Sequence, residues 1–424
     1  MFPTRWLPLQ LQRTVSMLIS ARTALLTLML ASARTAAQSA PASGGQPDSV
    51  ETRQVLVGVE HTRIVRASGP WIINVLRIDL RRSGIEIKTA RAHGQLRSRE
   101  RLSELVRRAE AAGTVVVAAI NADFFNLKSG ESENNQVIDG EWWKGVKVTD
   151  SPYDTFRNPH AQFGVDSARR PLIDRYQFDG IALTRTAAIP LIALNAIPTG
   201  PQEGSAFYTP RFGTAAPVVG AADSSKHTVE AVFIAVGQRL DTALYVRHGA
   251  AAMNGGSAIP TGGAVLTAYG PRSKDITAIG EGDTLKVVLR ATVAGVRPVP
   301  LAQLIGGWPQ IIRDGANIAG NAAATEGALS SNAEVRHPRS AIGFSRDSAT
   351  LFLVVVDGRS RHSVGMTLIE LAEFMRSLGA YQALNFDGGG SSTLIVQGKI
   401  VNSPSDVTLE RGIGNAVLIT RPKP

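Results

Sequence analysis

The most informative segment of the chain reads Ala383-Leu-Asn-Phe-Asp387-Gly-Gly-Gly-Ser-Ser-Thr-Leu-Ile-Val396. Two apolar runs bounded by a glycine cluster are typical of buried strands with a turn between them. Three glycines leave no side chain over the turn, so its backbone amides can approach another group closely. An aspartate beside such amides and the serine and threonine hydroxyls suits an anionic or polyhydroxyl ligand. The alternative is a tight hairpin with a solvated aspartate, because glycine turns are common.

The elements before this segment predict a strand–helix–strand unit. Residues 351–356 are uniformly apolar and indicate a buried strand, and residues 366–378 carry an apolar stripe at helical spacing, with Thr367 and Glu370 placed as a capping box. If the strands are parallel, Asp357 and Asp387 lie near each other, at the sheet edge where open α/β sheets collect ligands. Most other segments are strand-like with glycine turns. We therefore predict an α+β fold class, with a mixed β-sheet, glycine-rich turns and this C-terminal unit.

Composition narrows the class of protein. The chain has 424 residues, 44% of them hydrophobic, which suffices for one large domain or two ordinary ones. The absence of cysteine excludes disulfides, thiolate metal sites and a cysteine nucleophile. The formal net charge is +10, but no dense Lys/Arg block occurs and only 6% of residues are aromatic. We therefore predict no nucleic-acid partner.

The first 37 residues have the layout of a secretory signal peptide. A basic front with Arg5, Arg13 and Arg22 leads to an apolar run at 24–31, and small residues follow as far as Ala37. The run is short for a membrane span, although an uncleaved anchor is the alternative. Cleavage near Ala37 leaves a net charge of +6, because four arginines are removed. We expect a secreted or periplasmic protein with no membrane span after cleavage.

The rest of the chain divides by composition. Residues 38–52 are rich in Ser, Ala, Gly and Pro and predict a flexible linker. Residues 53–114 predict N-terminal strands and a helix packed on the main domain. That domain is expected to span 115–424, with an insert at about 127–227 whose mixed composition suggests an elaborated lid.

Acidic and basic residues cluster after the strand-like runs. Asp123, Asp357 and Asp387 each follow such a run, and Arg339 and Arg359 stand close to the same segments. Glycosyl transfer commonly uses two carboxyl groups, whereas a phosphate leaving group needs arginine more than a strong acid. Acids with arginines at one edge therefore fit cleavage of a sugar–phosphate bond.

Each of these residues also has a purely structural interpretation. Asp123 could cap a turn, and Glu370 could serve mainly as a helix cap. Arg339 and Arg359 could be ion-pair partners of the acids. The seven histidines show no zinc-binding spacing, and the chain has neither a nucleophile elbow nor a phosphate-binding P-loop.

An ordered series of motifs resembles the phosphodiester glycosidase family. The motifs are Asn121-Ala-Asp-Phe-Phe, Gly306-Gly-Trp-Pro-Gln with Asp314-Gly315, His337-Pro-Arg-Ser-Ala-Ile-Gly343, Val356-Asp-Gly-Arg359, Gly365-Met-Thr-Leu-Ile-Glu-Leu-Ala372, Asn385-Phe-Asp-Gly-Gly-Gly-Ser-Ser-Thr393, and Val401-Asn-Ser-Pro-Ser-Asp406 before Arg411 and Asn415. Any one motif is weak, but the series in this order, from about Val115 to Ile419, is specific. Trp308 departs from the smaller residue expected after Gly307, and the insert at 127–227 is unfamiliar.

The resemblance implies an exported glycosidase that hydrolyses a sugar-1-phosphodiester, in envelope or exopolysaccharide material. The alternative is a non-catalytic glycan-binding or envelope-assembly module on the same fold. The candidate catalytic residues are Asp123, Asp357, Glu370 and Asp387. The candidate substrate-binding residues are Asn121, Arg339, Arg359, Gly388, Gly389, Gly390, Ser391, Ser392 and Arg411. We expect the two arginines 339 and 359 on the phosphate, Asp357 or Glu370 as nucleophile or base, and Asp387 with the glycine turn on the sugar. No cofactor or metal is predicted, although a calcium ion near Asp387 is compatible with the residues.

Overall fold

The computed structural model describes residues 48–147, 160–198, 204–218, 228–239, 242–293, 297–327 and 334–422. The expected signal peptide and most of the expected linker lie outside these ranges. Within them, no helix is both long enough and apolar enough to cross a membrane.

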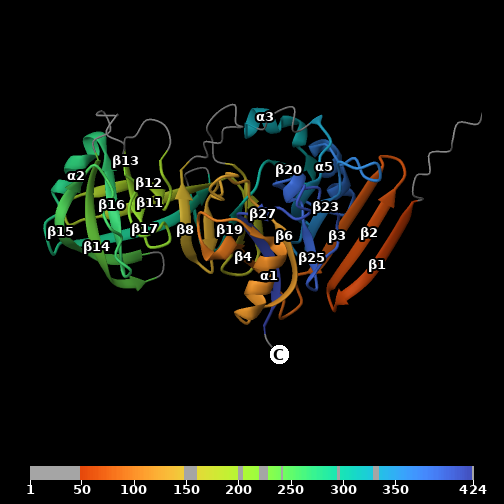
Figure 1. Ribbon diagram of the computed structural model, residues 1–424, viewed down its shortest axis with the longest axis horizontal. Helices are drawn as coiled ribbons and strands as arrows, with labels where there is room; N and C mark the ends of the chain where they lie inside the picture. Colours follow the sequence, from red (N-terminus) through yellow and green to blue (C-terminus); the bar gives the residue numbers. More distant parts are fainter. Residues whose placement is uncertain are drawn as a thin grey trace, which may run out of the picture. The chain divides into compact units, whose positions relative to one another are not determined.

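The core contains two stacked β-sheets. The larger sheet has the order β1 (Ser49–Leu56), β2 (Val59–Arg66), β3 (Trp71–Asp79), β23 (Thr350–Val356), β22 (Arg339–Phe344), β24 (Gln382–Phe386), β20 (Gln310–Arg313) and β21 (Ala316–Asn317). The smaller sheet has the order β26 (Lys399–Ile400), β25 (Leu394–Val396), β6 (Val115–Asn121), β28 (Asn415–Arg421) and β4 (Glu86–Arg91). Figure 1 shows β1, β2, β3 and β23 side by side in the larger sheet.

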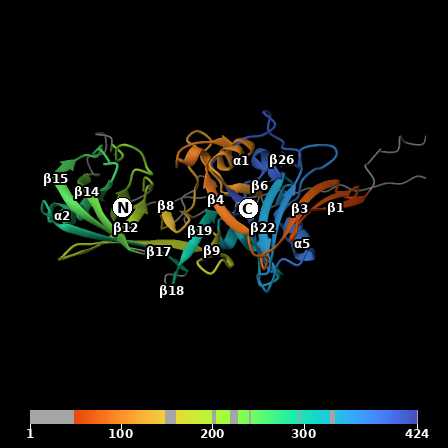
Figure 2. The ribbon, with the colours of Figure 1, turned by 90° about the horizontal axis from the view of Figure 1, so that it is seen from below.

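Alternation along β23 explains why the two sheets stack. Leu351, Leu353 and Val355 pack in one core cluster with Ile120 and other apolar residues of the smaller sheet. The intervening residues of β23 pack instead against helix α5 (Leu368–Ser377). Successive strand residues point to opposite faces, so a strand buried on both faces reads as one continuous apolar run. Figure 2 shows α5 close to β22 and β3.

Helix α1 (Leu102–Ala111) covers the outer face of the smaller sheet. Its buried Leu102, Leu105 and Val106 share a core cluster with Val116 of β6 and Leu418 of β28. The order of layers is therefore α5, the larger sheet, the smaller sheet and α1. A short pairing of β5 (Glu100–Arg101) with β27 (Gly412–Ile413) borders α1.

A closed barrel of seven strands occupies the middle of the chain. Its order is β11 (Tyr176–Leu183), β17 (Thr284–Val293), β15 (Thr242–Met253), β14 (Thr228–Arg239), β16 (Gly263–Tyr269), β13 (Gly204–Tyr208) and β12 (Ala188–Leu194), and β12 pairs back with β11. Apolar side chains that include Phe178, Phe207 and Phe233 fill it. A barrel this narrow is filled by side chains rather than hollow. The chain enters and leaves the barrel on paired strands, because Tyr176 lies opposite Val293.

Further strands extend the sheet from β12 of the barrel. They follow in the order β8 (Glu141–Val146), β7 (Gln136–Ile138), β19 (Leu301–Gly306), β9 (Gln162–Asp166) and β10 (Pro171–Asp174), while β18 (Arg297–Val299) pairs with β17. Other helices among the described residues are short: α2 (Ser273–Thr277), α3 (Ala322–Thr325) and the 3-10 turns η1 (Ala92–Gly94), η2 (Gly270–Arg272), η3 (Ala319–Asn321) and η4 (Gly389–Ser391).

The α+β prediction is wrong. Strands make up 52% of the residues that the structure describes and helices 12%, and the barrel makes this part of the chain mostly β. Helix α5 had the clearest pattern in the sequence, whereas glycines interrupt the pattern of the barrel strands β11, β14 and β15. The predicted strand–helix–strand unit is nevertheless present. Strands β23 and β24 both pair antiparallel with β22, so they run parallel to each other with β22 between them.

Candidate functional site

The site lies where the ends of β22, β23, β24 and β6 meet. Ser340 of β22 pairs with Val355 on one side and Phe386 on the other, so Asp357 and Asp387 follow on either side of β22. Their backbones are therefore separated by two strand spacings, about 10 Å. The prediction that both aspartates lie at one sheet edge is confirmed.

Asn121 joins the two sheets at this point. Its side-chain amide donates to the carbonyl of Asp387 (2.7 Å), and its oxygen accepts from the Ser340 hydroxyl (2.7 Å) and the Thr393 amide (3.1 Å). The side chain is fully buried. Asn121 thus fixes the glycine turn against β22 and does so as a positioning residue.

Two arginines cover the glycine turn. A Cβ atom on Gly389 would lie 2.8 Å from Nη2 of Arg359, and one on Gly390 would lie 2.5 Å from Nη2 of Arg411. Gly389 also has a φ of 60°, which glycine adopts without strain. The glycines therefore let two guanidinium groups approach the backbone of one turn, and the carboxylate of Asp406 lies beside the second of them. Nε of Arg411 donates to Asp406 at 2.7 Å, which fixes this arginine in place.

Asp357 is a buried carboxylate with one free oxygen. Its Oδ1 accepts from the amide of Ser403 (2.9 Å) and from Nδ2 of Asn402 (3.2 Å). Its Oδ2 is buried and has no hydrogen-bond partner. Burial raises the pKa of Asp357 to about 6. One oxygen is thus held in place by protein groups, and the unpaired oxygen is the candidate for contact with a ligand.

Asp387 has a similarly raised pKa for a partly different reason. Burial raises the pKa of the Asp387 carboxyl to about 6, and the negative charge of Asp123 also raises it. Arg411 and the nearby Ser391 hydroxyl act in the opposite direction. Part of Asp387 remains accessible, unlike Asp357. The site therefore holds two carboxyl groups that change charge just below neutral pH.

Asp123 is held tightly behind Asp387. Its two oxygens accept from the backbone amide and Nδ2 of Asn134 (3.0 and 2.7 Å), and burial raises its pKa. A Cβ atom on Gly306 would lie 2.3 Å from its carboxyl carbon, so only glycine fits at that position. The bonds come from a residue eleven positions away and not from a local turn, and Asp123 lies close enough to Asp387 for its charge to raise the pKa of that carboxyl.

Arg339 and Arg359 differ sharply in their surroundings. Arg339 is buried, and its guanidinium donates to the carbonyls of Met366 and Val335, both at 2.9 Å. Burial lowers the pKa of Arg339 to about 10, so it remains charged at neutral pH. Arg359 is exposed and follows Gly358 with a φ of 60°. Arg359 is therefore the more accessible of the two expected phosphate ligands.

Glu370 forms the capping box of α5. Its amide donates to the Thr367 hydroxyl, and its carboxylate accepts from the Thr367 amide. The carboxylate also pairs with Arg336, with Nη2 and Oε1 at 2.5 Å. Burial alone would raise the pKa of Glu370, but the hydrogen bonds from Arg336 outweigh it and the pKa lies below its usual value. Both carboxylate oxygens are occupied by structural partners.

The variant Glu370→Gln distinguishes a catalytic role of Glu370 from its role as a helix cap. Glu370→Gln keeps an acceptor for the Thr367 amide and loses only the charge, so we expect turnover to stay within about threefold of wild type. Glu370→Ala loses the cap and should lower the free energy of unfolding by roughly 1 kcal/mol. Activity and urea unfolding of both variants test this. A hundredfold loss of turnover in Glu370→Gln, with unchanged unfolding, would place the carboxylate in the chemistry.

Several residues of the site were not predicted. Asn402 and Ser403 orient Asp357, and Asn134 orients Asp123. His337 lies near Arg339 and Arg359. Burial lowers the pKa of His337, and the charges of these two arginines lower it further. Asn402, Ser403 and His337 lie within motifs quoted above and could have been found there. Asn134 lies in the segment expected to be a lid, where no pattern marked it.

The predicted hydroxyls end in the same buried region. Ser391 and Ser392 are fully buried, as is Thr393, and the hydroxyl oxygens of Ser392 and Thr393 have no hydrogen-bond partner. Buried polar groups are normally paired, so this cluster is prepared for water or a ligand. Among the described residues, no group of three or more His, Asp or Glu side chains is arranged to hold a metal ion.

Trp308, the residue that departs from the family pattern, packs close to Asp123. Its ring stacks on His160 with centroids 4.8 Å apart and meets Phe124, the neighbour of Asp123, edge-on at 5.5 Å. Its indole nitrogen donates to the carbonyl of Glu326 at 3.0 Å. The bulky ring thus forms part of the wall behind Asp123.

Comparison with known proteins identifies one family whose model matches part of the chain. Residues 240–420 match the model of the phosphodiester glycosidase family. N-acetylglucosamine-1-phosphodiester alpha-N-acetylglucosaminidase of mouse is 34% identical over 114 residues, which cover 25% of this chain and 22% of the mouse protein. The human protein of the same name is 35% identical over a segment of the same length and coverage. The uncharacterized SPbeta prophage-derived protein YomE of Bacillus subtilis is 42% identical over 88 residues, 21% of this chain and 13% of that protein.

The matched segments therefore span at most about a fifth of these curated relatives. Two solved structures share the fold over most of the chain. A hypothetical protein from Synechocystis has a TM-score of 0.68 at 22% identity, over 88% of this chain and 64% of that one. A Burkholderia pseudomallei protein described as exported has a TM-score of 0.63 at 24% identity, over 83% and 74%. The resemblance that the motifs predict is thereby confirmed: residues 240–420 of this chain match the phosphodiester glycosidase family.

Proposed function

We propose that the protein hydrolyses the bond between a sugar and the phosphate of a sugar-1-phosphodiester. The observation that carries the proposal is the glycine turn: Arg359 approaches Gly389, Arg411 approaches Gly390, and the turn lies between two carboxyl groups with pKa values of about 6. Guanidinium groups bind phosphate oxygens in pairs and stabilise the charge that develops on a departing phosphate. Glycosyl transfer commonly also uses a pair of carboxyl groups, and the two aspartates supply that pair.

The residues divide the work as follows in this proposal. Arg359 and Arg411 hold the phosphodiester over the glycine turn, and buried Arg339 adds positive charge behind it. Asp357 acts as nucleophile or base through its unpaired Oδ2. Asp387 holds sugar hydroxyls, together with the serine hydroxyls that follow it. Phosphate is a good leaving group, so no strong acid is required to protonate it.

The proposal is tested by turnover of purified protein on a panel of methyl esters of sugar-1-phosphates, with and without EDTA. We expect EDTA-insensitive release of free sugar. In water labelled with oxygen-18, the label should enter the sugar, because the bond between carbon and oxygen breaks. Label in the phosphate would contradict the proposal and indicate a phosphodiesterase. Tight binding without turnover for every ester would identify a glycan-binding module instead.

The pH dependence of turnover follows from Asp357. A nucleophile or base must be ionised, so kcat/KM should rise with pH to a plateau above an apparent pKa near 6. Because Asp387 ionises in the same pH range, the rising part of the profile reports the ionisation of both carboxyl groups together. A rate profile from pH 4.5 to 8 measures it. A flat profile over that range would exclude Asp357 from this role.

We further propose that the enzyme is exported and acts on envelope or exopolysaccharide material. The basic and apolar pattern of residues 1–37 supports export, and a structural relative is described as exported. Retention of the protein in the cytoplasmic fraction, measured by fractionation of cells that express the full chain, would contradict this location.

A further inference from the structure

A second pocket lies apart from the carboxylate cluster. It has a volume of about 1150 Å³ and is lined by barrel strands β14, β15 and β17 together with β8 and β19. None of the predicted site residues lines it. Typical small-molecule pockets measure roughly 300–1,000 Å³, so this one has room for more than a single sugar ring.

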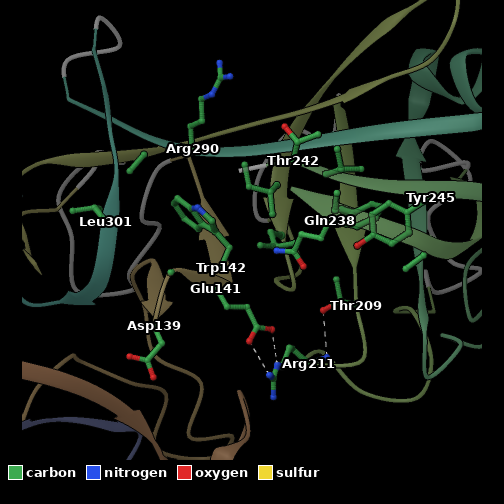
Figure 3. A pocket seen from close by; sticks show the side chains of 18 of the residues that line it. Asp139, Glu141, Trp142, Thr209, Arg211, Gln238, Thr242, Tyr245, Arg290 and Leu301 are labelled. Atoms are coloured by element: carbon green, nitrogen blue, oxygen red, sulfur yellow. Dashed lines mark hydrogen bonds and ion pairs between the residues drawn. The ribbon is translucent and has the colours of Figure 1, made fainter. Parts of the chain in front are cut away.

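Two aromatic side chains point into the pocket from opposite sides. Figure 3 shows Trp142 and Tyr245 facing it, with Gln238 between them. Each ring is fixed from behind by an edge-on contact: Trp142 meets Phe178 at 5.2 Å, and Tyr245 meets Phe207 at 5.2 Å. Both rings are only partly buried. Aromatic side chains of this kind offer a flat apolar surface on which the C–H face of a sugar ring can pack.

Polar groups accompany the rings. Gln238 lines the pocket and carries a side-chain amide. Burial, and then the charge of Glu141, raise the pKa of Tyr245, so its hydroxyl remains protonated and can donate. Amides and hydroxyls beside an apolar surface are the groups that give orientation and specificity in such pockets. They match the many hydroxyls of a carbohydrate.

Most charged groups at the rim are paired with one another, and the side chain of Arg290 points away from the other labelled side chains (Figure 3). Arg211 binds Glu141 through two hydrogen bonds of 2.8 and 3.0 Å, and its guanidinium lies 4.0 Å from the Trp143 ring centre. Asp139 pairs with Lys88 at 2.7 Å. The fixed Arg211–Glu141 pair forms a rigid polar edge (Figure 3). A ligand therefore gains little from carrying charge here.

We propose that this pocket binds a neutral oligosaccharide, with sugar rings packed on Trp142 and Tyr245 and hydroxyls bonded to Gln238. The inference does not depend on the proposed hydrolysis. It assigns the protein a glycan-binding site that is separate from the acids and can retain a polymeric carbohydrate on the barrel.

Isothermal titration calorimetry tests it with neutral tetrasaccharides of glucose, mannose and N-acetylglucosamine. Gln238→Ala should weaken binding about 2- to 10-fold through the lost hydrogen bonds, and Tyr245→Ala about tenfold or more. Leu244→Ala is the matched control. It sits beside Tyr245 on β15, is 39% exposed, and does not line the pocket, so affinity should be unchanged.

The outcomes separate the two proposals. Affinity that survives Asp357→Asn and falls in Gln238→Ala supports a distinct glycan site, whether or not the protein hydrolyses any ester. No binding of any tetrasaccharide overturns it, as does equal affinity in Gln238→Ala, Tyr245→Ala and wild type. Binding of dodecanoate in place of every tetrasaccharide also overturns it and assigns the pocket to an apolar ligand.

Discussion

Asp357→Asn is expected to lower turnover at least about 1,000-fold while making the folded protein more stable at pH 7.5. The loss of turnover follows because an amide cannot act as nucleophile or base. The gain in stability follows because the carboxyl of Asp357 has a pKa of about 6 when folded, above its value in the unfolded chain. At neutral pH the folded state must therefore hold an unfavourable charge. Asparagine removes this charge and can still accept from Ser403 through its oxygen.

The sign of the pH effect is specific. A raised carboxyl pKa contributes stability that is fully present below the unfolded pKa, near 4, and is lost as pH rises through about 6. The variant should accordingly match wild type below pH 4 and exceed it by roughly 2–3 kcal/mol above pH 7. Urea unfolding of both proteins between pH 3.5 and 8 measures the difference. A variant that is less stable than wild type at pH 7.5 would show that Asp357 also has a structural role as an anion.

Asn121→Ala is expected to destabilise the protein by roughly 3–5 kcal/mol, because it leaves a buried carbonyl, a hydroxyl and an amide without partners. These are the groups of Asp387, Ser340 and Thr393 that Asn121 now binds. The glycine turn loses its link to β22, so turnover should fall as well. Thermal and urea unfolding provide the measurement.

A surface asparagine provides the control for this prediction. Asn317 donates to Glu373 (2.8 Å) and to the carbonyl of Ile369 (3.2 Å) in bonds exposed to solvent, and it accepts from the Ala319 amide (3.1 Å) in a partly buried one. Asn317→Ala should cost under about 1 kcal/mol, since water can replace the lost partners. If both alanine variants lose the same stability, Asn121 does not have the proposed joining role.

Local sequence patterns predicted the structure well, whereas pairings between distant segments were not predicted. The strand that ends at Asp357, the helix that Thr367 caps and the glycine turn after Asp387 are local, because each depends on residues within a few positions. Their sheet-edge placement also followed, since a helical crossover constrains strand direction. The barrel did not follow. Its closure depends on β12 pairing with β13 across a connection, and no local pattern marks that contact.

The region expected to be a lid shows the same limit. Strand β11 alternates Tyr176, Phe178, Gly180 and Ala182 on its buried side, which is a regular strand period. Its glycine and its polar residues weakened that signal, so residues 127–227 were expected to form a lid with only short strands, such as one at 162–165. Residues that bind the acids from distant segments were not predicted either. Asn134, which donates to Asp123, is an example.

The paired ends of the barrel have a consequence for how this protein can change over evolutionary time. Tyr176 and Val293 face each other across β11 and β17, so the chain departs and returns at neighbouring points. A recombination event need rejoin only these two ends to exchange the whole ring. Asp357 and Asp387 owe their spacing to β22, outside that ring. What the barrel binds can therefore diversify between lineages while the carboxylate pair keeps its register.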